Sequence, residues 1–179
     1  MAMSTRTLQT FEQFEQFQDD GMKHELLKGE HIVVPPAKLY HALIQEKLVE
    51  SLRPYVRHHR MGRVHSEVGF KLTSRTWLQP DVCFVRPPQI RATDPRDYYH
   101  GAPALAVEIA SESNTAAQIA LKMELYFAHG SEEVWVVYPK TKKVRVHDPD
   151  GNSKAVAGAE LSSDLFPGWS VAVDLLFED

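Results

Sequence analysis

The sequence predicts an α/β fold in which a mixed sheet is packed between helices. Residues 38–53 and 115–128 have the three- and four-residue apolar spacing of amphipathic helices. Three strand-like runs lie between these two helical segments, and a fourth run follows the second helical segment. The order helix, three strands, helix, strand buries the apolar faces in a sheet with a helix on either side. Further elements are expected before and after this core.

The chain before the first long helix predicts a short helix and a strand pair. Residues 8–18 follow helical spacing, with Phe11 and Phe14 facing inward. Runs 24–27 and 31–34 flank a Lys-Gly-Glu segment, which is typical of two strands joined by a tight turn.

Proline and charged residues set the expected limits of the elements that follow. Pro54 is expected to end the first long helix, because proline removes a helix hydrogen bond. The strand-like runs cover 64–72, 78–85 and 104–109. Segment 86–102 is rich in proline and charge and is therefore expected to be a surface loop.

The C-terminal part of the chain predicts the second long helix and further strands. The helix at 115–128 is expected to end before Gly130, since glycine is common just beyond helix C-termini. Runs 134–138 and 143–147 predict a strand pair, and 171–173 predicts one more strand in a less regular tail.

Composition narrows the class of protein. The chain has 179 residues, 43% hydrophobic and 25% charged, and no repeat or linker, so residues 1–179 predict a single domain. Its net charge of −4 excludes an overall cationic field, so any binding to polyanions must be local. Cys83 is the only cysteine, which excludes an intramolecular disulfide and a cysteine-clustered zinc site. The absence of a signal-like or membrane-spanning apolar run predicts a cytoplasmic protein with no membrane partner.

Two acidic residues, Asp81 and Glu108, lie within apolar strand-like runs. An ionised carboxylate removed from water is costly unless it is paired with a cation, binds a metal or becomes protonated. Lys122 lies at the edge of the apolar face of the second helix, where its ammonium could reach both acids. The alternative is that Lys122 extends to water and the acids sit at strand ends.

These residues and several others, taken in order, resemble the Uma-two family of the PD-(D/E)XK nuclease superfamily. The likeness extends from about residue 22 to about residue 147, and the predicted core order is also that of the superfamily. The motifs that carry it are Glu25-Leu26-Leu27-Lys28-Gly29-Glu30, His41, Pro80-Asp81, Val107-Glu108-Ile109, Lys122, Tyr126 and Glu133-Val134-Trp135-Val136-Val137.

The resemblance implies a metal-dependent endonuclease that hydrolyses phosphodiester bonds in DNA. It implies that Asp81 and Glu108 hold Mg²⁺ or Mn²⁺. Lys122 would then orient the attacking water or neutralise charge that develops on the phosphate. Glu25 is a candidate ligand through water, and His41 is a candidate contact to phosphate or to a carboxylate.

The sequence departs from the family pattern at three places. Ala110 stands where the superfamily's commonest form has its lysine, so Lys122 must act from the helix. Ser111-Glu112-Ser113 replaces Ser-Pro-Ser, and Gln118 replaces an aspartate. One alternative is therefore a catalytically inactive module of the same fold that binds nucleic acid or a protein. Another is a structural protein whose strand acids are paired with Lys and Arg.

A basic stretch at 53–65 contains four arginines, three histidines and no acidic residue. Arg57, Arg60 and Arg63 are candidates to contact a nucleic-acid backbone, although a solvated helix end and loop would have the same composition. A homodimer is plausible, because two copies cut both strands of a duplex most easily.

Overall fold

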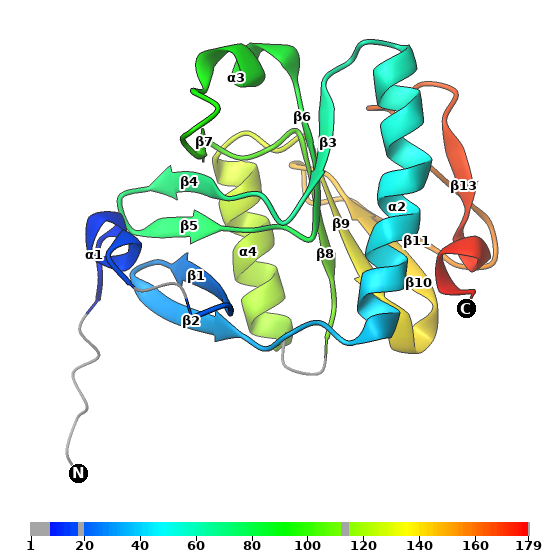
Figure 1. Ribbon diagram of the computed structural model, residues 1–179. Coiled ribbons are helices and arrows are strands. Elements are labelled where there is room, and N and C mark those ends of the chain that lie inside the picture. Colours follow the sequence, from blue (N-terminus) through cyan, green and yellow to red (C-terminus); the bar gives the residue numbers. More distant parts are fainter. Residues whose placement is uncertain (1–7, 18–19, 112–114, 179) are drawn as a thin grey trace.

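Two larger sheets and one small hairpin organise residues 8–17, 20–111 and 115–178, the part of the chain that the computed structural model describes (Figure 1). The longest helices cover opposite faces of the larger sheet, which confirms the predicted α/β class. None of the helices in these ranges combines the length and apolar content that a bilayer crossing requires.

The larger sheet has six strands and contains the predicted core strands. From edge to edge its strands are β11 (Ser153–Val156), β10 (Lys143–His147), β9 (Glu133–Tyr138), β8 (Leu105–Ile109), β6 (Val82–Val85) and β3 (Arg63–Ser66). Strands β8 and β9 are parallel, and the other neighbours are antiparallel. Helix α2 (Leu39–His58) and the C-terminal segment pack on one face, and α4 (Ala116–Ala128) packs on the other.

The second sheet has five strands and lies on the α4 side of the first. Its strands, in spatial order, are β2 (Glu30–Val34), β1 (Lys23–Leu27), β5 (Thr76–Leu78), β4 (Phe70–Thr73) and β7 (Tyr99–His100). The remaining elements are α1 (Phe11–Glu15), α3 (Pro87–Ala92), β12 (Glu160–Ser162), β13 (Ser170–Ala172) and the 3-10 helices η1 (Pro139–Thr141) and η2 (Val173–Phe177). The predicted β1–β2 hairpin is confirmed, and Phe11 and Phe14 of α1 are buried.

Two of the predicted strands are each divided between the sheets. The run 64–72 forms β3 and β4, because Glu67 has a left-handed φ of 53° that turns the chain. The run 78–85 forms β5 and β6, because Pro80 has no N–H to donate to a strand ladder. Asp81 therefore lies just before β6, where the chain crosses from one sheet to the other, and not within a strand.

Helix α2 is longer than predicted. It continues through Pro54 to His58, so the prediction that Pro54 ends it is wrong. Proline in a helix costs about 3 kcal/mol. Leu52 and Val56, on either side of this position, are fully buried against the sheet, and their packing offsets that cost.

The regions expected to be irregular also contain regular structure. Segment 86–102 is not only a surface loop, since it holds α3 and β7. The C-terminal tail contains β11, β12 and η2 besides the predicted strand. These elements are too short for their apolar spacing to be read in the sequence.

Helix α4 begins and ends as predicted, but its buried face differs. Thr115 and Gln118 form a capping box, so the glutamine that replaces the family's aspartate keeps a contact at the helix start. The buried residues of α4 are Ile119, Lys122, Leu125 and Tyr126. Lys122 is thus at the centre of the buried face and not at its edge.

Gly62 fixes the turn between α2 and β3. Its φ is +150°, and a Cβ at this position would overlap the carbonyl oxygen of Val85 on β6. We expect Gly62→Ala to lower the free energy of unfolding by about 3 kcal/mol, through backbone strain and overpacking. Gly158 is the matched control, because its φ is +59° and no atom lies within 4 Å of the position that a Cβ would occupy. Urea unfolding of both variants checks this, and equal losses would contradict it.

Candidate active site

All five residues predicted to act in catalysis meet at the junction of the two sheets. Glu25 comes from β1, Asp81 from the segment before β6, and Glu108 from β8. Lys122 reaches them from α4, and His41 lies in the first turn of α2. A second lysine, Lys23 of β1, also reaches this junction, although the sequence analysis missed it. We call the three acids and two lysines the acid–lysine cluster: Glu25, Asp81, Glu108, Lys23 and Lys122.

Lys122 is the centre of this cluster. Its Nζ donates to Glu25 Oε1 at 3.0 Å and to Glu108 Oε2 at 3.1 Å, and it lies 2.7 Å from Glu25 Oε2. Only 7% of Lys122 is exposed, so the alternative in which it extends to water is wrong. Burial alone would lower its pKa, but the charges of Glu108 and Glu25 raise the pKa above its usual value. Lys122 is therefore a cation at neutral pH.

Asp81 is held by backbone and side-chain donors. Its Oδ2 accepts from the backbone N–H of Ile109 at 2.7 Å, and its Oδ1 accepts from Lys23 Nζ at 3.1 Å. His41 Nε2 lies 3.4 Å from the same Oδ1. Burial would raise the pKa of Asp81, but His41, Lys23 and the Ile109 N–H together hold the pKa well below its usual value. Asp81 is thus an anion.

Glu108 differs from Asp81 in its electrostatic setting. Its Oε1 accepts from the hydroxyl of Tyr126 at 2.7 Å. Burial raises the pKa of Glu108 above its usual value, the charge of Lys122 opposes this rise, and the nearby Asp81 adds to it. A divalent cation beside Glu108 would favour its ionised form, so cation binding and loss of a proton are expected to be coupled.

Lys23 was missed in the sequence, and Tyr126 was noted there only as part of the family motif, although each has a signal for its place in the site. Lys23 is two residues before Glu25 on β1, so strand alternation places both on one face. Tyr126 is four residues after Lys122, so helical spacing places them on one face of α4. Lys23 has 18% of its side chain exposed, more than any acid of the cluster.

The donors of the cluster fit a hard divalent cation. When all five groups are ionised, the three carboxylates and two ammonium groups leave one net negative charge. Mg²⁺ prefers oxygen ligands and is often held by one or two carboxylates plus water. Asp81 and Glu108 meet this need, since Val82 and Val107, their chain neighbours, are paired between β6 and β8. Within the described ranges, no group of three or more His, Cys, Asp or Glu residues is arranged as a complete metal site.

The predicted nucleic-acid residues lie elsewhere. Arg57, Arg60 and Arg63 line a surface cavity together with Arg91 of α3. Asp81 precedes β6 and α3 follows it, so the cavity and the acid–lysine cluster are at opposite ends of this strand. Of the Ser111-Glu112-Ser113 departure, Glu112 and Ser113 lie outside the described residues.

Comparisons with known proteins agree with this fold. The model of the Uma2 family, described as "Putative restriction endonuclease", matches residues 8–174. The chain belongs to the Uma2 family. A crystal structure of a "putative nuclease" from Anabaena variabilis has the same fold as this Uma2 protein, with a TM-score of 0.83 and 18% sequence identity. The match covers 94% of this chain and 97% of that one. No curated protein matches the chain.

Membership of the Uma2 family confirms the resemblance drawn from the sequence motifs. The family indicates a protein of the nuclease class.

Proposed function

We propose that this Uma2 protein is a metal-dependent endonuclease that hydrolyses phosphodiester bonds in DNA. The observation that carries the proposal is the convergence of Asp81, Glu108 and Lys122 in one buried, charged cluster. These side chains come from separate elements and are held by hydrogen bonds of 2.7–3.1 Å. Burying several charges is costly, and perturbed ionisable groups of this kind are typical of functional sites.

Asp81 and Glu108 are the residues that would hold Mg²⁺ or Mn²⁺. When bound, such a cation polarises a phosphate and lowers the pKa of an attacking water. The Ile109 N–H and the hydroxyl of Tyr126 each donate to one of the two carboxylates and so orient them. Gln45 donates to the backbone carbonyl of Asp81 at 2.8 Å and so fixes the chain where it carries the acid.

The two lysines have different parts in this proposal. Lys122 is saturated by Glu25 and Glu108 and positions both acids. Within the described structure, the Lys23 ammonium has one hydrogen-bonded partner, Asp81, and its side chain is more exposed than that of Lys122. We infer that Lys23 is the ammonium that faces the phosphate and offsets the charge that develops there.

Lys23→Ala is expected to lower kcat by about 10²-fold, the usual effect of removing one donor to a developing charge. Lys23→Arg should restore part of the rate, because it keeps the charge. Lys143 is an exposed lysine of β10, and Lys143→Ala is the matched control. Steady-state cleavage of a fluorescent duplex measures these rates, and an unchanged kcat in Lys23→Ala would rule out this role.

The proposal is tested by incubating supercoiled plasmid with the purified full chain. We expect nicked and linear DNA with Mg²⁺ or Mn²⁺, no product with EDTA, and recovery when Mn²⁺ is added in excess. No cleavage under any of these conditions would favour the alternative, an inactive nuclease-fold module. Linear product formed without free nicked circles would further support two copies acting together.

A further inference from the structure

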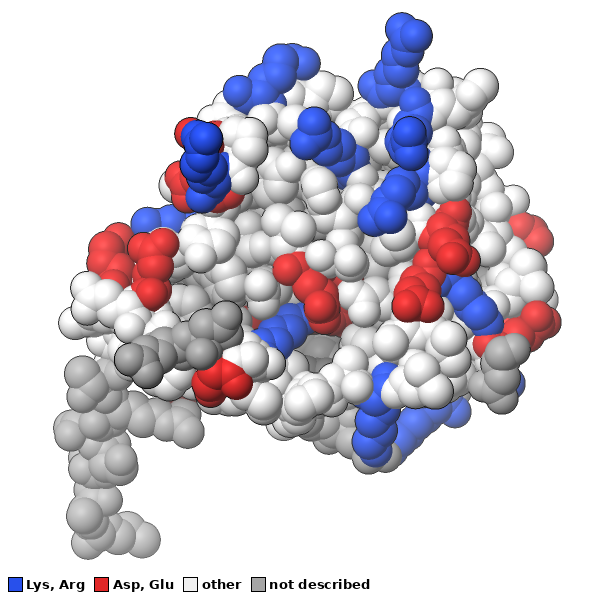
Figure 2. All heavy atoms as spheres, viewed as in Figure 1, with Lys and Arg blue, Asp and Glu red and all other residues white. Residues whose placement is uncertain are grey.

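A surface cavity of about 460 Å³ is lined mainly by arginines. Its lining residues are Arg57, Arg60, Gly62, Arg63, Pro87, Ile90 and Arg91, with no acidic residue among them. We call the four guanidinium groups and the space between them the arginine cavity. Figure 2 shows basic side chains gathered over α3 and the C-terminal end of α2, the two helices that border it.

Among the described residues, the four arginines have no partner of opposite charge. Within the part of the chain that the structure describes, none of their guanidinium groups forms an ion pair or a side-chain hydrogen bond. Arg86, next to Pro87, shows the contrast, since it binds Glu132 through two hydrogen bonds of 2.5 and 2.7 Å. Like charges without counter-charges repel one another, so an anion in the cavity would be stabilised by all four.

The fold holds three of these arginines on separate elements, and Arg60 lies in the turn between α2 and β3. Arg57 is in the last turn of α2, Arg63 begins β3, and Arg91 is in the last turn of α3. Arg63 is paired with Val85 of β6, and Gly62 packs against that same residue. The cavity is therefore built by the junction of α2, β3 and α3, and not by one flexible loop.

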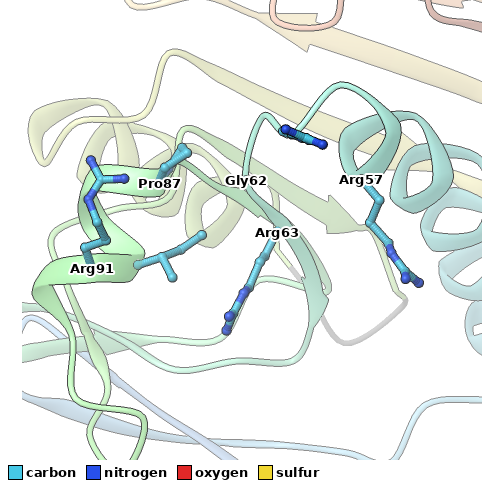
Figure 3. Close-up of a pocket in the computed structure, with 7 residues that line it drawn as sticks. Arg57, Gly62, Arg63, Pro87 and Arg91 are labelled. Atoms are coloured by element: carbon cyan, nitrogen blue, oxygen red, sulfur yellow. The ribbon is translucent and has the colours of Figure 1, made fainter.

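The directions of the side chains indicate what kind of anion fits. In Figure 3 the guanidinium groups of Arg57, Arg63 and Arg91 end at separate points around the cavity and do not converge on one point. A single phosphate ion would contact only one or two of them. A polymer with repeated phosphates would contact all of them, and arginine forks bind phosphate oxygens well.

We propose that the arginine cavity binds the phosphate backbone of a nucleic acid, as a site separate from the acid–lysine cluster. The identity of this polyanion rests on the proposed function, since a phosphodiesterase acts on such a backbone. The extended chain from Asp81 to Pro87 spans roughly 20 Å, at about 3.3 Å per residue. That span corresponds to roughly six base pairs of B-form DNA. The cavity therefore holds the duplex several base pairs from the bond that is cut.

The experiment measures binding of a fluorescein-labelled 20-bp DNA duplex by anisotropy, in EDTA so that no cleavage occurs. Arg63→Ala/Arg91→Ala removes two guanidinium groups from different elements. Arg75→Ala/Arg145→Ala is the matched control, because both of these arginines are exposed and lie outside the cavity. Thermal unfolding checks that each variant is folded, and Arg63→Lys/Arg91→Lys keeps the charge.

The plot of log affinity against log salt has a negative slope that steepens by about 0.9 for each phosphate contact. The cavity variant loses two contacts, so we expect its slope to be shallower than that of the wild type by about two units. Between 50 and 200 mM salt the wild type would then lose about 12-fold more affinity than the variant does. The control should keep the wild-type slope, and the lysine variant should keep most of it.

Three outcomes would overturn the inference. The first is an unchanged slope in the cavity variant, and the second is an equal change in the control. The third comes from testing the same variants with phosphatidylserine vesicles: it is a cavity variant that loses vesicle binding but keeps DNA binding. The plasmid assay is independent of these results. If the slope falls as expected but no plasmid is cut, the proposed nuclease activity fails while the nucleic-acid site stands.

Discussion

Lys122→Ala is expected to lower the free energy of unfolding by about 3–5 kcal/mol, the usual cost of removing one partner from a buried ion pair. Glu25 and Glu108 are 1% and 7% exposed, and both depend on the Lys122 ammonium. Without it, two carboxylates would face each other in the interior. The protein could reduce this cost only by protonating one of them.

The measurement is the midpoint of thermal and urea unfolding. Lys143→Ala, an exposed lysine of β10, should unfold like the wild type. Lys122→Met combined with Glu25→Gln should recover much of the lost stability, because it removes a negative charge along with the positive one. If Lys122→Ala were as stable as the wild type, the cluster would not be the coupled, buried set of charges described above.

Asp81→Asn is expected to lower the rate of DNA cleavage by roughly 10³-fold, at the upper end of what one electrostatic group contributes to a transition state. Asparagine has nearly the same shape and can still accept from the Ile109 N–H, so the fold should persist. The substitution removes the negative charge of the Asp81 carboxylate. In the wild type this carboxylate is ionised, because His41 and Lys23 keep the pKa of Asp81 low.

Asp150→Asn is the control for this change, since Asp150 is an exposed residue of a distant turn. Plasmid nicking with Mg²⁺ compares the two variants. Cleavage that survives in Asp81→Asn would show that the reacting phosphate is bound somewhere other than the acid–lysine cluster.

Local sequence patterns predicted the elements that carry Glu25 and Glu108, whereas Asp81 was expected within a strand and lies just before β6. The apolar alternation of β8 placed Glu108 opposite Leu105, Val107 and Ile109, and these three are buried in the core as expected. The helical spacing and the terminal glycine defined α4 to within a residue. Acids inside apolar runs are costly enough to mark a site without any structure.

Contacts between distant segments could not be predicted in this way. Lys23 pairs with Asp81 only because the β1–β2 hairpin joins the second sheet beside β5. Arg91 joins the arginine cavity because α3 folds back beside Gly62, although its segment has the composition of a loop. In both cases the position of a residue follows from the pairing of whole elements and not from its neighbours in the sequence.

The basic stretch at 53–65 shows a similar limit. Its composition allowed either a solvated helix end or a nucleic-acid contact. The structure adds that Pro54 lies inside α2 and that the later arginines border a cavity free of acidic residues. The choice between the two interpretations thus depends on how the stretch is packed, which its composition does not determine.

The Mn²⁺ affinity measured by isothermal titration calorimetry tests most directly whether Asp81 and Glu108 hold a catalytic cation. Even the loss of a residue that only orients a metal ligand weakens binding by about 10–100-fold, so Asp81→Asn and Glu108→Gln should each weaken it at least this much. Asp150→Asn should bind like the wild type. Equal Mn²⁺ affinity in the wild type, Asp81→Asn and Glu108→Gln would contradict the account.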